Sequence, residues 1–276
     1  METIGNSIKR VDAVAKVTGK AKFPGDFQFT DQLTMKVLFA GRPHAIIHSI
    51  NIEKAMAIPG VVTVLTAKDV PNNEYGLSIP DQPVLCGPGS NKEFADRVRF
   101  EGDQVALVVA ENEQIATHAL KAIEVEYEDL PITSTLDEAL SNDAFIIHPD
   151  LGSNVFQHNM VRFGNVEAAF QKCAVIVEKE YRTPVQEHAY LQPEAGVAFM
   201  DKEERITVIV GGQWVHEDQE QIAHALNLPL DRIRVIYPYI GGAFGGREDM
   251  SVQIILALAV KKLHEMGIDR PVRIVW

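Results

Sequence analysis

The sequence predicts an α+β protein with two domains, and three observations support this prediction. Strand-like, helix-like and strand-like runs follow one another within residues 104–131, as in a βαβ-like or split α+β unit. Short apolar runs of strand length also occur on both sides of that unit. Residues 131–160 contain few periodic apolar positions, and the turn-forming sequence HPDLGSN occupies 148–154. We therefore predict one domain over 1–148 and a second over 149–276.

The first predicted domain mixes short strands with turns. Residues 61–66 (VVTVLT) are predicted to form a strand because they follow the turn-forming pair Pro59-Gly60. In ENEQIATHALKAI (111–123) the apolar residues recur at helical spacing, which predicts a helix. The other expected elements are a long surface loop over 71–93, a strand over 104–110 and a strand in IEVEYEDLP (123–131) that Pro131 stops.

The second predicted domain continues this mixture of elements. Its last helix is expected to begin near Arg247, run through VQIILALAVKKL and end before Gly267, because glycine commonly terminates helices. Its last strand, PVRIVW, reaches Trp276, so we expect another chain, or a longer form of this sequence, to complete the sheet. The other expected elements are strands over 174–181, 205–210 and 232–237 and a helix over 218–226.

The composition disfavours several classes of partner and site. The formal net charge is 26 − 38 = −12, which disfavours nucleic acids and anionic membranes as partners. No apolar run reaches the roughly 18 residues of a membrane-spanning helix, and METIGNSIKR lacks the apolar core of a signal peptide. The two cysteines, Cys86 and Cys173, form no CxxC pattern, which excludes a local cysteine-held zinc or iron–sulfur site and favours the cytoplasm.

The sequence IGGAFGGRED (240–249) lies between a strand-like run and a helix-like run. This layout can direct backbone N–H groups at an anion. A P-loop would need Lys and Ser or Thr where Arg247 and Glu248 stand, and Ala243 interrupts the G-x-G-x-x-G spacing. Two interpretations remain: a tight turn that requires positive φ, or a bare backbone against which a ligand packs beside Phe244.

Other catalytic patterns are incomplete. His216 and Glu217 begin an H-E pair, but the second histidine of H-E-x-x-H is missing. A G-x-S-x-G nucleophile elbow does not occur in the sequence. We therefore predict no side chain that ligates a metal directly.

Four segments, taken together and in this order, resemble one enzyme family. They are SIKRVDAVAKVTGKAKFPGD near the N-terminus, EGDQVALVVAENEQIATHALKAIEVEYEDLP, VQEHAYLQPEA (185–195) and IGGAFGGRED. Together they resemble the molybdopterin-binding subunits of the molybdenum hydroxylases, the xanthine dehydrogenase and aldehyde oxidase family. The resemblance covers nearly the whole chain. It implies an α/β hammerhead-like domain followed by the first part of a molybdopterin-binding α+β domain.

The resemblance also implies a cofactor and the residues that bind it. The cofactor is molybdenum held by a molybdopterin, expected in its cytosine dinucleotide form, and the reaction inserts oxygen from water at an electron-poor carbon. Gln186 falls on the glutamine that hydrogen-bonds an oxo ligand of molybdenum, although a turn residue bonded to backbone is the alternative. Phe244 falls on the loop aromatic beside the metal site. The other implied cofactor-binding residues are Gly242, Ala243, Gly245 and Gly246.

Two residues are assigned to the substrate by the same resemblance. Glu248 falls on a position that contacts the heterocycle in purine-oxidising members, so we expect a purine or related N-heterocycle; a solvated acid at a helix start is the alternative. Arg247 is the second, and it stands where the family often has lysine. One departure is Gln192, where the family commonly has glutamate, although Glu194 is near enough to compensate.

The family's catalytic glutamate lies in a later motif of longer subunits, and no segment of this chain matches it. We therefore expect no catalytic base on this chain. The expected partners are a second molybdopterin-binding chain or a C-terminal portion, an iron–sulfur subunit with 2Fe-2S clusters and an FAD subunit. The rival interpretation is a non-catalytic assembly module of a multi-subunit oxidoreductase that holds no molybdenum.

Overall fold

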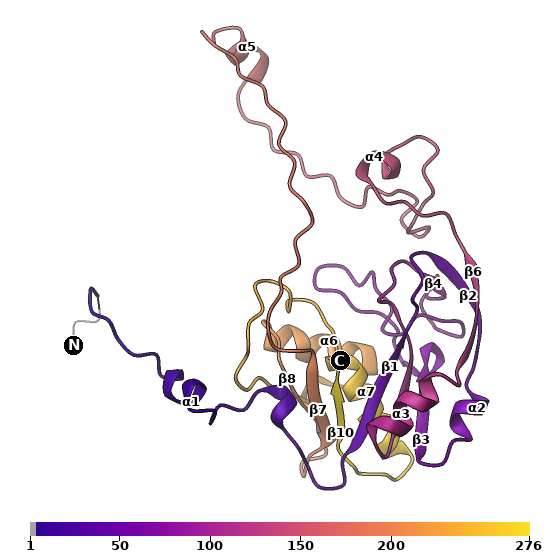
Figure 1. Cartoon of the computed structure of the whole chain (residues 1–276). Coiled ribbons are helices and arrows are strands. Elements are labelled where there is room, and N and C mark those ends of the chain that lie inside the picture. The colour runs from indigo at the N-terminus through magenta and orange to yellow at the C-terminus, as the bar shows by residue number, and fades with distance from the viewer. Residues whose placement is uncertain (1–3) are drawn as a thin grey trace. The chain divides into compact units, whose positions relative to one another are not determined.

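A computed structural model describes residues 4–276, and the chain divides into two compact units (Figure 1). The first unit contains the chain up to Ile132 and the chain from Ala189 onward, and the second unit contains Thr133–His188. The domain boundary predicted near residue 148 falls within the second unit, and the division into 1–148 and 149–276 stays a prediction.

A seven-stranded mixed sheet forms the centre of the first unit. Strand Leu33–Phe39 is parallel to Val272–Val275, and Ile206–Val210 is parallel to Ile233–Ile236. The other neighbours are antiparallel. Three of the strands precede residue 111 and four follow residue 194, so the sheet joins both halves of the sequence. Its strand order is β3 (Val61–Thr66), β5 (Gln104–Ala110), β1 (Leu33–Phe39), β10 (Val272–Val275), β7 (Ala195–Met200), β8 (Ile206–Val210) and β9 (Ile233–Ile236).

Strand β5 is buried on both faces of this sheet. Leu107 and Val109 pack in the larger core, whereas Ala106 and Val108 pack in a smaller core against α3 (Glu113–Leu120). A strand covered on both faces needs apolar residues at every position, which explains the uninterrupted run QVALVVA.

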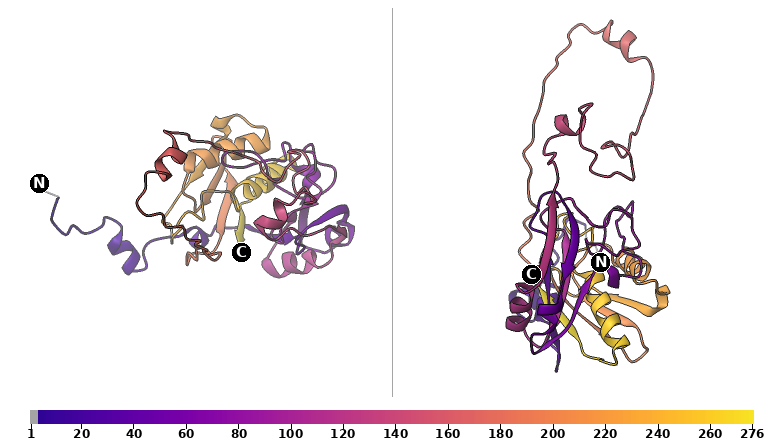
Figure 2. Two further views of the ribbon diagram at one scale, coloured as in Figure 1. Left: turned by 90° about the horizontal axis from the view of Figure 1, so that it is seen from above. Right: turned by 90° about the vertical axis from the view of Figure 1, so that its right-hand side faces the viewer.

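Two helices cover the other face of the sheet, opposite α3 (Figure 2). The helix α7 (Gln253–Glu265) packs on β7, β8 and β10, and α6 (Val215–Leu226) packs on α7 and β9. Every residue from Ile254 to Val260 is buried, so α7 is apolar on all sides, as the core helix of a large domain should be.

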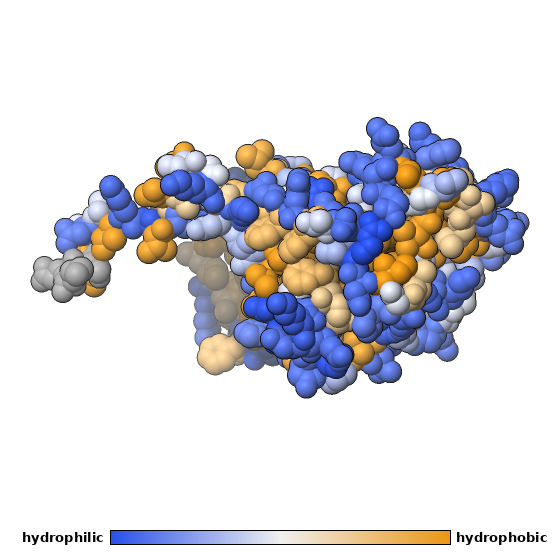
Figure 3. Space-filling view, turned by 90° about the horizontal axis from the view of Figure 1, so that it is seen from below, coloured by the Kyte–Doolittle hydropathy of each residue, from blue (hydrophilic) through white to orange (hydrophobic). Residues whose placement is uncertain are grey.

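A smaller sheet contains β4 (Arg97–Val98), β2 (Ala45–Asn51) and β6 (Glu124–Asp129), all antiparallel. The predicted strand–helix–strand unit is therefore confirmed in its split form, because β5 and β6 belong to different sheets. The remaining short α-helices of this unit are α1 (Ala13–Val17) and α2 (Glu53–Met56), and three 3-10 helices cover Pro24–Asp26, Ala67–Asp69 and Leu230–Arg232. The helix α1 buries no residue, and apolar groups are exposed along this N-terminal segment (Figure 3).

The second unit contains little regular structure. Its helices are α4 (Leu136–Ala139) and α5 (Val166–Phe170), capped by Thr135 and Asn165. The strand predicted over 174–181 is wrong, because no strand of the described residues pairs with this segment. An apolar run needs a hydrogen-bonding neighbour to become a strand, and here Val175 and Val177 are exposed instead.

Three further differences concern element boundaries and missed elements. Helix α7 begins at Gln253 rather than near Arg247, because residues 247–252 are held in irregular structure by side-chain bonds described below. The predicted loop over 71–93 is a loop, but Asn73 and Leu85 are buried within it and bond to each other. The strands missed by sequence analysis are β1, β2, β4 and β7.

Candidate functional site

The glycine loop, defined as residues 241–246, follows β9 and combines positive φ angles with exposure. Gly242, Phe244 and Gly245 have φ values of 106°, 55° and 89°. The left-handed region costs a non-glycine residue about 1–2 kcal/mol, so neighbouring contacts must hold Phe244 in place. Phe244 is nevertheless 76% exposed, so its ring is accessible from outside the loop.

Two glycines of the loop are required by contacts within the chain. A Cβ added to Gly241 would lie 2.7 Å from Cβ of Gln192, closer than real Cβ contacts allow. A Cβ added to Gly242 would lie 3.1 Å from Cβ of Tyr190, at a φ that side chains rarely adopt. Two of the glycines are therefore needed because residues 190–192 pack closely against the loop.

The backbone N–H groups of the loop fall into two sets. Those of Gly242, Ala243 and Phe244 donate to no atom among residues 4–276. Three successive unused donors at an exposed turn suit an anionic group, so this part of the predicted cofactor site fits a pterin carrying phosphate. The bonded set is Gly241 N to Gln192 Oε1 (2.7 Å), Gly245 N to Gln213 Oε1 (3.0 Å) and Gly246 N to Ala243 O (2.9 Å).

Arg247 lies beneath the loop and is 2% exposed. Its guanidinium donates to Glu194 (3.0 Å) and to the carbonyl oxygen of Gln192 (2.7 Å). It also donates to the carbonyl oxygen of Gly242 (3.2 Å), and its Cζ lies 4.1 Å from the ring centroid of Tyr190. A buried guanidinium bonded in this way supports the loop, and the contact with substrate expected for Arg247 stays a prediction.

Glu194 is the carboxylate that lies closest along the chain to the departure at Gln192. It accepts hydrogen bonds from the hydroxyls of Tyr190 (2.7 Å) and Ser251 (2.6 Å), in addition to Arg247. Gln192 instead uses its Oε1 to accept from the Gly241 amide. The bonds of Glu194 and Gln192 are thus different ones, and compensation by Glu194 for the departure at Gln192 stays a prediction.

Glu248 is half-buried and lies two residues after the loop. Its Oε1 accepts a hydrogen bond of 3.4 Å from Nε2 of Gln213. Gln213 was missed by sequence analysis, and the available signal was a polar residue directly after the pair Gly211-Gly212 at the end of β8.

Gln186 lies in the second unit, near its C-terminal end. Its side chain is exposed, and Nε2 donates to the carbonyl oxygen of Glu187 over 3.2 Å. The hydrogen bond of Gln186 to the metal oxo group stays a prediction.

A buried carboxylate lies in the core next to the segment that follows the loop. Asp218 of α6 is 1% exposed and accepts from the Tyr237 hydroxyl and from Nε2 of Gln253 (3.2 Å). Loss of solvation raises the pKa of Asp218 to about 6, and the same cause raises the pKa of Tyr237. These bonds join α6, the end of β9 and the start of α7.

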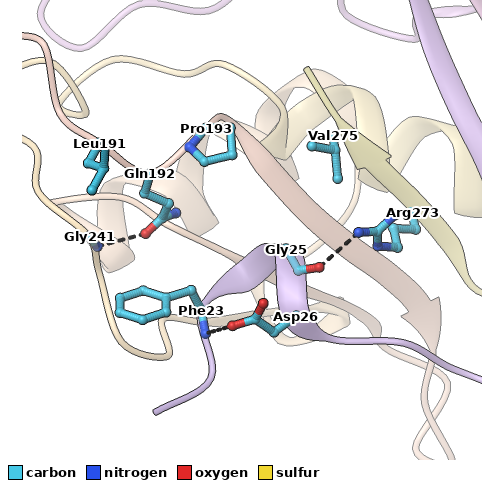
Figure 4. A pocket seen from close by; sticks show the side chains of 9 residues that line it. All are labelled: Phe23, Gly25, Asp26, Leu191, Gln192, Pro193, Gly241, Arg273 and Val275. Atoms are coloured by element: carbon cyan, nitrogen blue, oxygen red, sulfur yellow. Dashed lines mark hydrogen bonds between the residues drawn. The ribbon is translucent and has the colours of Figure 1, made fainter. Parts of the chain in front are cut away.

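A cavity of about 400 Å³ opens beside Gly241 (Figure 4). Two buried atoms near it, Nε2 of Gln192 and Nε of Arg273, have no hydrogen-bond partner within residues 4–276. Two further polar contacts lie in its wall: Arg273 donates to Gly25 O (2.8 Å), and Phe23 N donates to Asp26 (2.9 Å). The lining residues are Phe23, Gly25, Asp26, Leu191, Gln192, Pro193, Gly241, Arg273 and Val275.

Two features are absent from the part of the chain that the structure describes. No group of three or more His, Cys, Asp or Glu side chains within 4–276 is arranged to hold a metal ion. Over the same range, every helix is too short or too polar to cross a membrane.

Two protein families match this chain in succession. The family described as the aldehyde oxidase and xanthine dehydrogenase a/b hammerhead domain matches residues 18–131. The family described as the molybdopterin cofactor-binding domain matches residues 147–276, which include the glycine loop. The expected order of the two domain types is therefore confirmed.

Curated relatives and solved structures agree with these matches. The chain is 38% identical to the nicotinate dehydrogenase large molybdopterin subunit of Eubacterium barkeri, over 93% of this chain and 58% of the relative. It is 32% identical to the xanthine dehydrogenase molybdenum-binding subunit of Escherichia coli O157:H7, over 92% of this chain and 34% of the relative. The chain thus spans about a third to three fifths of the length of these relatives.

Among solved structures, quinoline 2-oxidoreductase from Pseudomonas putida 86 matches with a TM-score of 0.86 and 25% identity, over 100% of this chain and 35% of that chain. The aldehyde oxidoreductase from Desulfovibrio desulfuricans matches with a TM-score of 0.83 and 27% identity, over 99% and 30%. The chain belongs to the molybdenum hydroxylases, the family of xanthine dehydrogenases and aldehyde oxidases.

Proposed function

We propose that this chain is the molybdopterin-binding part of a cytoplasmic oxidoreductase that hydroxylates a purine or a related N-heterocycle. The unused amides of Gly242, Ala243 and Phe244 carry the proposal, because they offer an anion-binding surface at an exposed turn. The bound cofactor, a molybdopterin cytosine dinucleotide with molybdenum, would supply oxygen transfer from water and accept two electrons. Gln186 would donate a hydrogen bond to it.

Glu248 supports the choice of a heterocyclic substrate. Its carboxylate is half-buried, lies two residues after the glycine loop and accepts a hydrogen bond from Gln213, so it can also accept one from a ring N–H. Nicotinate, xanthine and quinoline, which appear in the names of similar proteins, are all nitrogen heterocycles. Aldehyde oxidoreductases are also similar to this chain, so the acid at position 248 is the feature that favours the heterocycle.

The catalytic base and the electron acceptors are proposed to lie outside this sequence. A second molybdopterin-binding chain or a C-terminal portion would supply the base, and iron–sulfur and FAD subunits would carry the electrons away. In this arrangement the residues of this chain bind the cofactor, orient the substrate and hold both at a fixed spacing.

The test is an anaerobic assay of the native complex, isolated through this chain, with an artificial electron acceptor. The substrates are hypoxanthine, nicotinate, quinoline and benzaldehyde, and incorporation of ¹⁸O from labelled water is measured by mass spectrometry. We expect ¹⁸O in a heterocyclic product and a much lower kcat/KM for benzaldehyde. Preferential oxidation of the aldehyde would contradict the substrate class, and no turnover of any substrate would favour an assembly module.

A further inference from the structure

The buried carboxylate of Asp218 is joined to the support of the glycine loop by a continuous chain of hydrogen bonds. Gln253, which is 1% exposed, donates from Nε2 to Oδ2 of Asp218 over 3.2 Å. Its Oε1 accepts from the backbone amide of Ser251 (2.8 Å), and the Ser251 hydroxyl donates to Glu194 (2.6 Å). Glu194 is the carboxylate that pairs with Arg247 beneath the loop.

The groups that face the Asp218 carboxylate come from the ends of β8 and β9 and from α7. Tyr237, directly after β9, donates its hydroxyl to the same Oδ2 as Gln253 of α7. The end of β8 contributes Gly212, where an added Cβ would lie 3.0 Å from Oδ2. Asp249, in the segment before α7, acts through its charge and raises the pKa of Asp218 further. When Asp218 is ionised, two neutral donors therefore stabilise its charge.

The charge of Asp218 determines how firmly the Gln253 side chain is oriented. An ionised carboxylate only accepts hydrogen bonds, so the NH₂ end of Gln253 faces it and the oxygen end faces the Ser251 amide. Hydrogen bonds to an ionised group are roughly twice as strong as those between neutral groups. Protonation at Oδ2 weakens both bonds and adds an O–H where two donors already point, so one donor has to turn away.

We propose that Gln253 is a positioning residue that makes the order of the glycine loop depend on the charge of Asp218. With Asp218 ionised, the chain of bonds through Ser251 and Glu194 is complete. With Asp218 protonated, the Gln253 side chain turns, the Ser251 amide loses its acceptor, and the support of the loop loosens. A consequence for the cofactor rests on the function proposed above, whereas the ordering of the loop does not.

The proposed effect on the loop is opposite in sign to the effect of Asp218 on the whole fold. Loss of solvation raises the pKa of Asp218 to about 6, so protonation favours the folded chain as the pH falls. The same protonation weakens the local bonds of Gln253 and Ser251. Exchange of individual backbone amides therefore separates the proposed effect from a change in global stability.

Hydrogen–deuterium exchange of the native complex at pH 5 and pH 7.5 tests the proposal, in peptides that cover residues 245–252. Rates are divided by those of unstructured peptides at the same pH, which removes the intrinsic effect of pH on exchange. We expect protection of the wild type to be about tenfold lower at pH 5. In Asp218→Asn the amide oxygen accepts from both donors at either pH, so protection should stay constant. The control Glu220→Gln, at an exposed acid of α6, should keep the tenfold change.

A second variant, Gln253→Met, removes both hydrogen bonds of the side chain and keeps its approximate size. We expect low protection of the same peptides at both pH values, as in the wild type at pH 5. Wild-type protection that is independent of pH, or a tenfold change that persists in Asp218→Asn, would overturn the proposal. If the native complex contains no molybdenum while the exchange pattern holds, the proposed function fails and the role of Gln253 stands.

Discussion

Arg247 and Glu194 form a buried ion pair, with a distance of 3.0 Å and side chains that are 2% and 10% exposed. The pair joins the end of the glycine loop to the residue that precedes β7. The hydroxyls of Tyr190 and Ser251 complete the bonding of the carboxylate. The loop is therefore anchored to the central sheet at its C-terminal end.

Breaking this pair should destabilise the fold strongly. Glu194→Gln leaves the buried guanidinium without its counter-charge, so we expect the free energy of unfolding to fall by about 3 kcal/mol or more in urea titrations. The control is Glu111→Gln, which breaks the more exposed pair of Glu111 with Arg270 (2.8 Å) and should cost at most about 1 kcal/mol. Equal effects of the two substitutions would show that the buried pair does not anchor the loop.

The conformation of Gly242 leads to a second prediction, about the stability of an alanine variant. Gly242→Ala introduces a side chain at φ 106° and 3.1 Å from Cβ of Tyr190, and we expect a loss of about 2–3 kcal/mol of stability. Gly267→Ala is the matched control, because Gly267 also has positive φ (75°) but has open space around it, and it should cost only about 1 kcal/mol. Thermal unfolding of both variants measures the difference, and a Gly242 variant as stable as the control would refute the steric argument.

The sequence predicted those strands and helices that a short run of apolar residues is enough to identify. The strands β3, β5, β6, β8, β9 and β10 and the helix α3 are recognisable from short runs of the sequence. Strand β7 is not, because AGVAFM contains Gly196, which disfavours a strand; the fold requires it there, since an added Cβ would lie 2.6 Å from Val210.

The candidate site was predictable only in part, for a similar reason. The spacing of the glycines and the resemblance point to the loop itself. Arg247 is bonded by Gln213, which lies 34 positions away along the chain, and by Glu194, which lies 53 positions away. No local pattern encodes such contacts, so the sequence did not predict that the Arg247 guanidinium bonds within the core.

The burial of Asp218 leads to a prediction about how the stability of the fold depends on pH. Its pKa rises from 3.8 in the unfolded chain to about 6 in the folded protein, mainly because burial disfavours the charged form. Protonation therefore favours folding: this contribution is fully present below pH 3.8 and is lost as the pH rises through about 6. Asp218→Asn stays neutral and can still accept a hydrogen bond, so its stability relative to the wild type should increase by about 2 kcal/mol between pH 4 and 7.

The measurement is urea unfolding of both proteins across this pH range. The difference in unfolding free energy between the two proteins removes the contributions of the other carboxylates, which both proteins share. One of these is Asp201, whose pKa is lowered to about 2. A difference that is independent of pH would show that Asp218 does not titrate in this range.

The role proposed for Glu248 leads to a prediction about substrate choice. Glu248→Gln keeps the size of the side chain but removes its charge, so we expect kcat/KM for the heterocycle to fall by about 10²-fold while turnover of an aldehyde changes little. Glu220→Gln, an exposed acid of α6, is the control and should have no effect on either substrate. Equal losses for both substrates in Glu248→Gln would remove the reason for preferring a heterocycle.

The central claim is that this chain helps to hold a molybdenum cofactor, and metal analysis of the native complex tests it most directly. The complex is isolated through this chain, its subunits are identified by mass, and molybdenum and released cytidine monophosphate are quantified. We predict about one molybdenum and one cytidine monophosphate for each copy of this chain. A fully assembled complex without molybdenum would contradict the claim and would favour a non-catalytic assembly module.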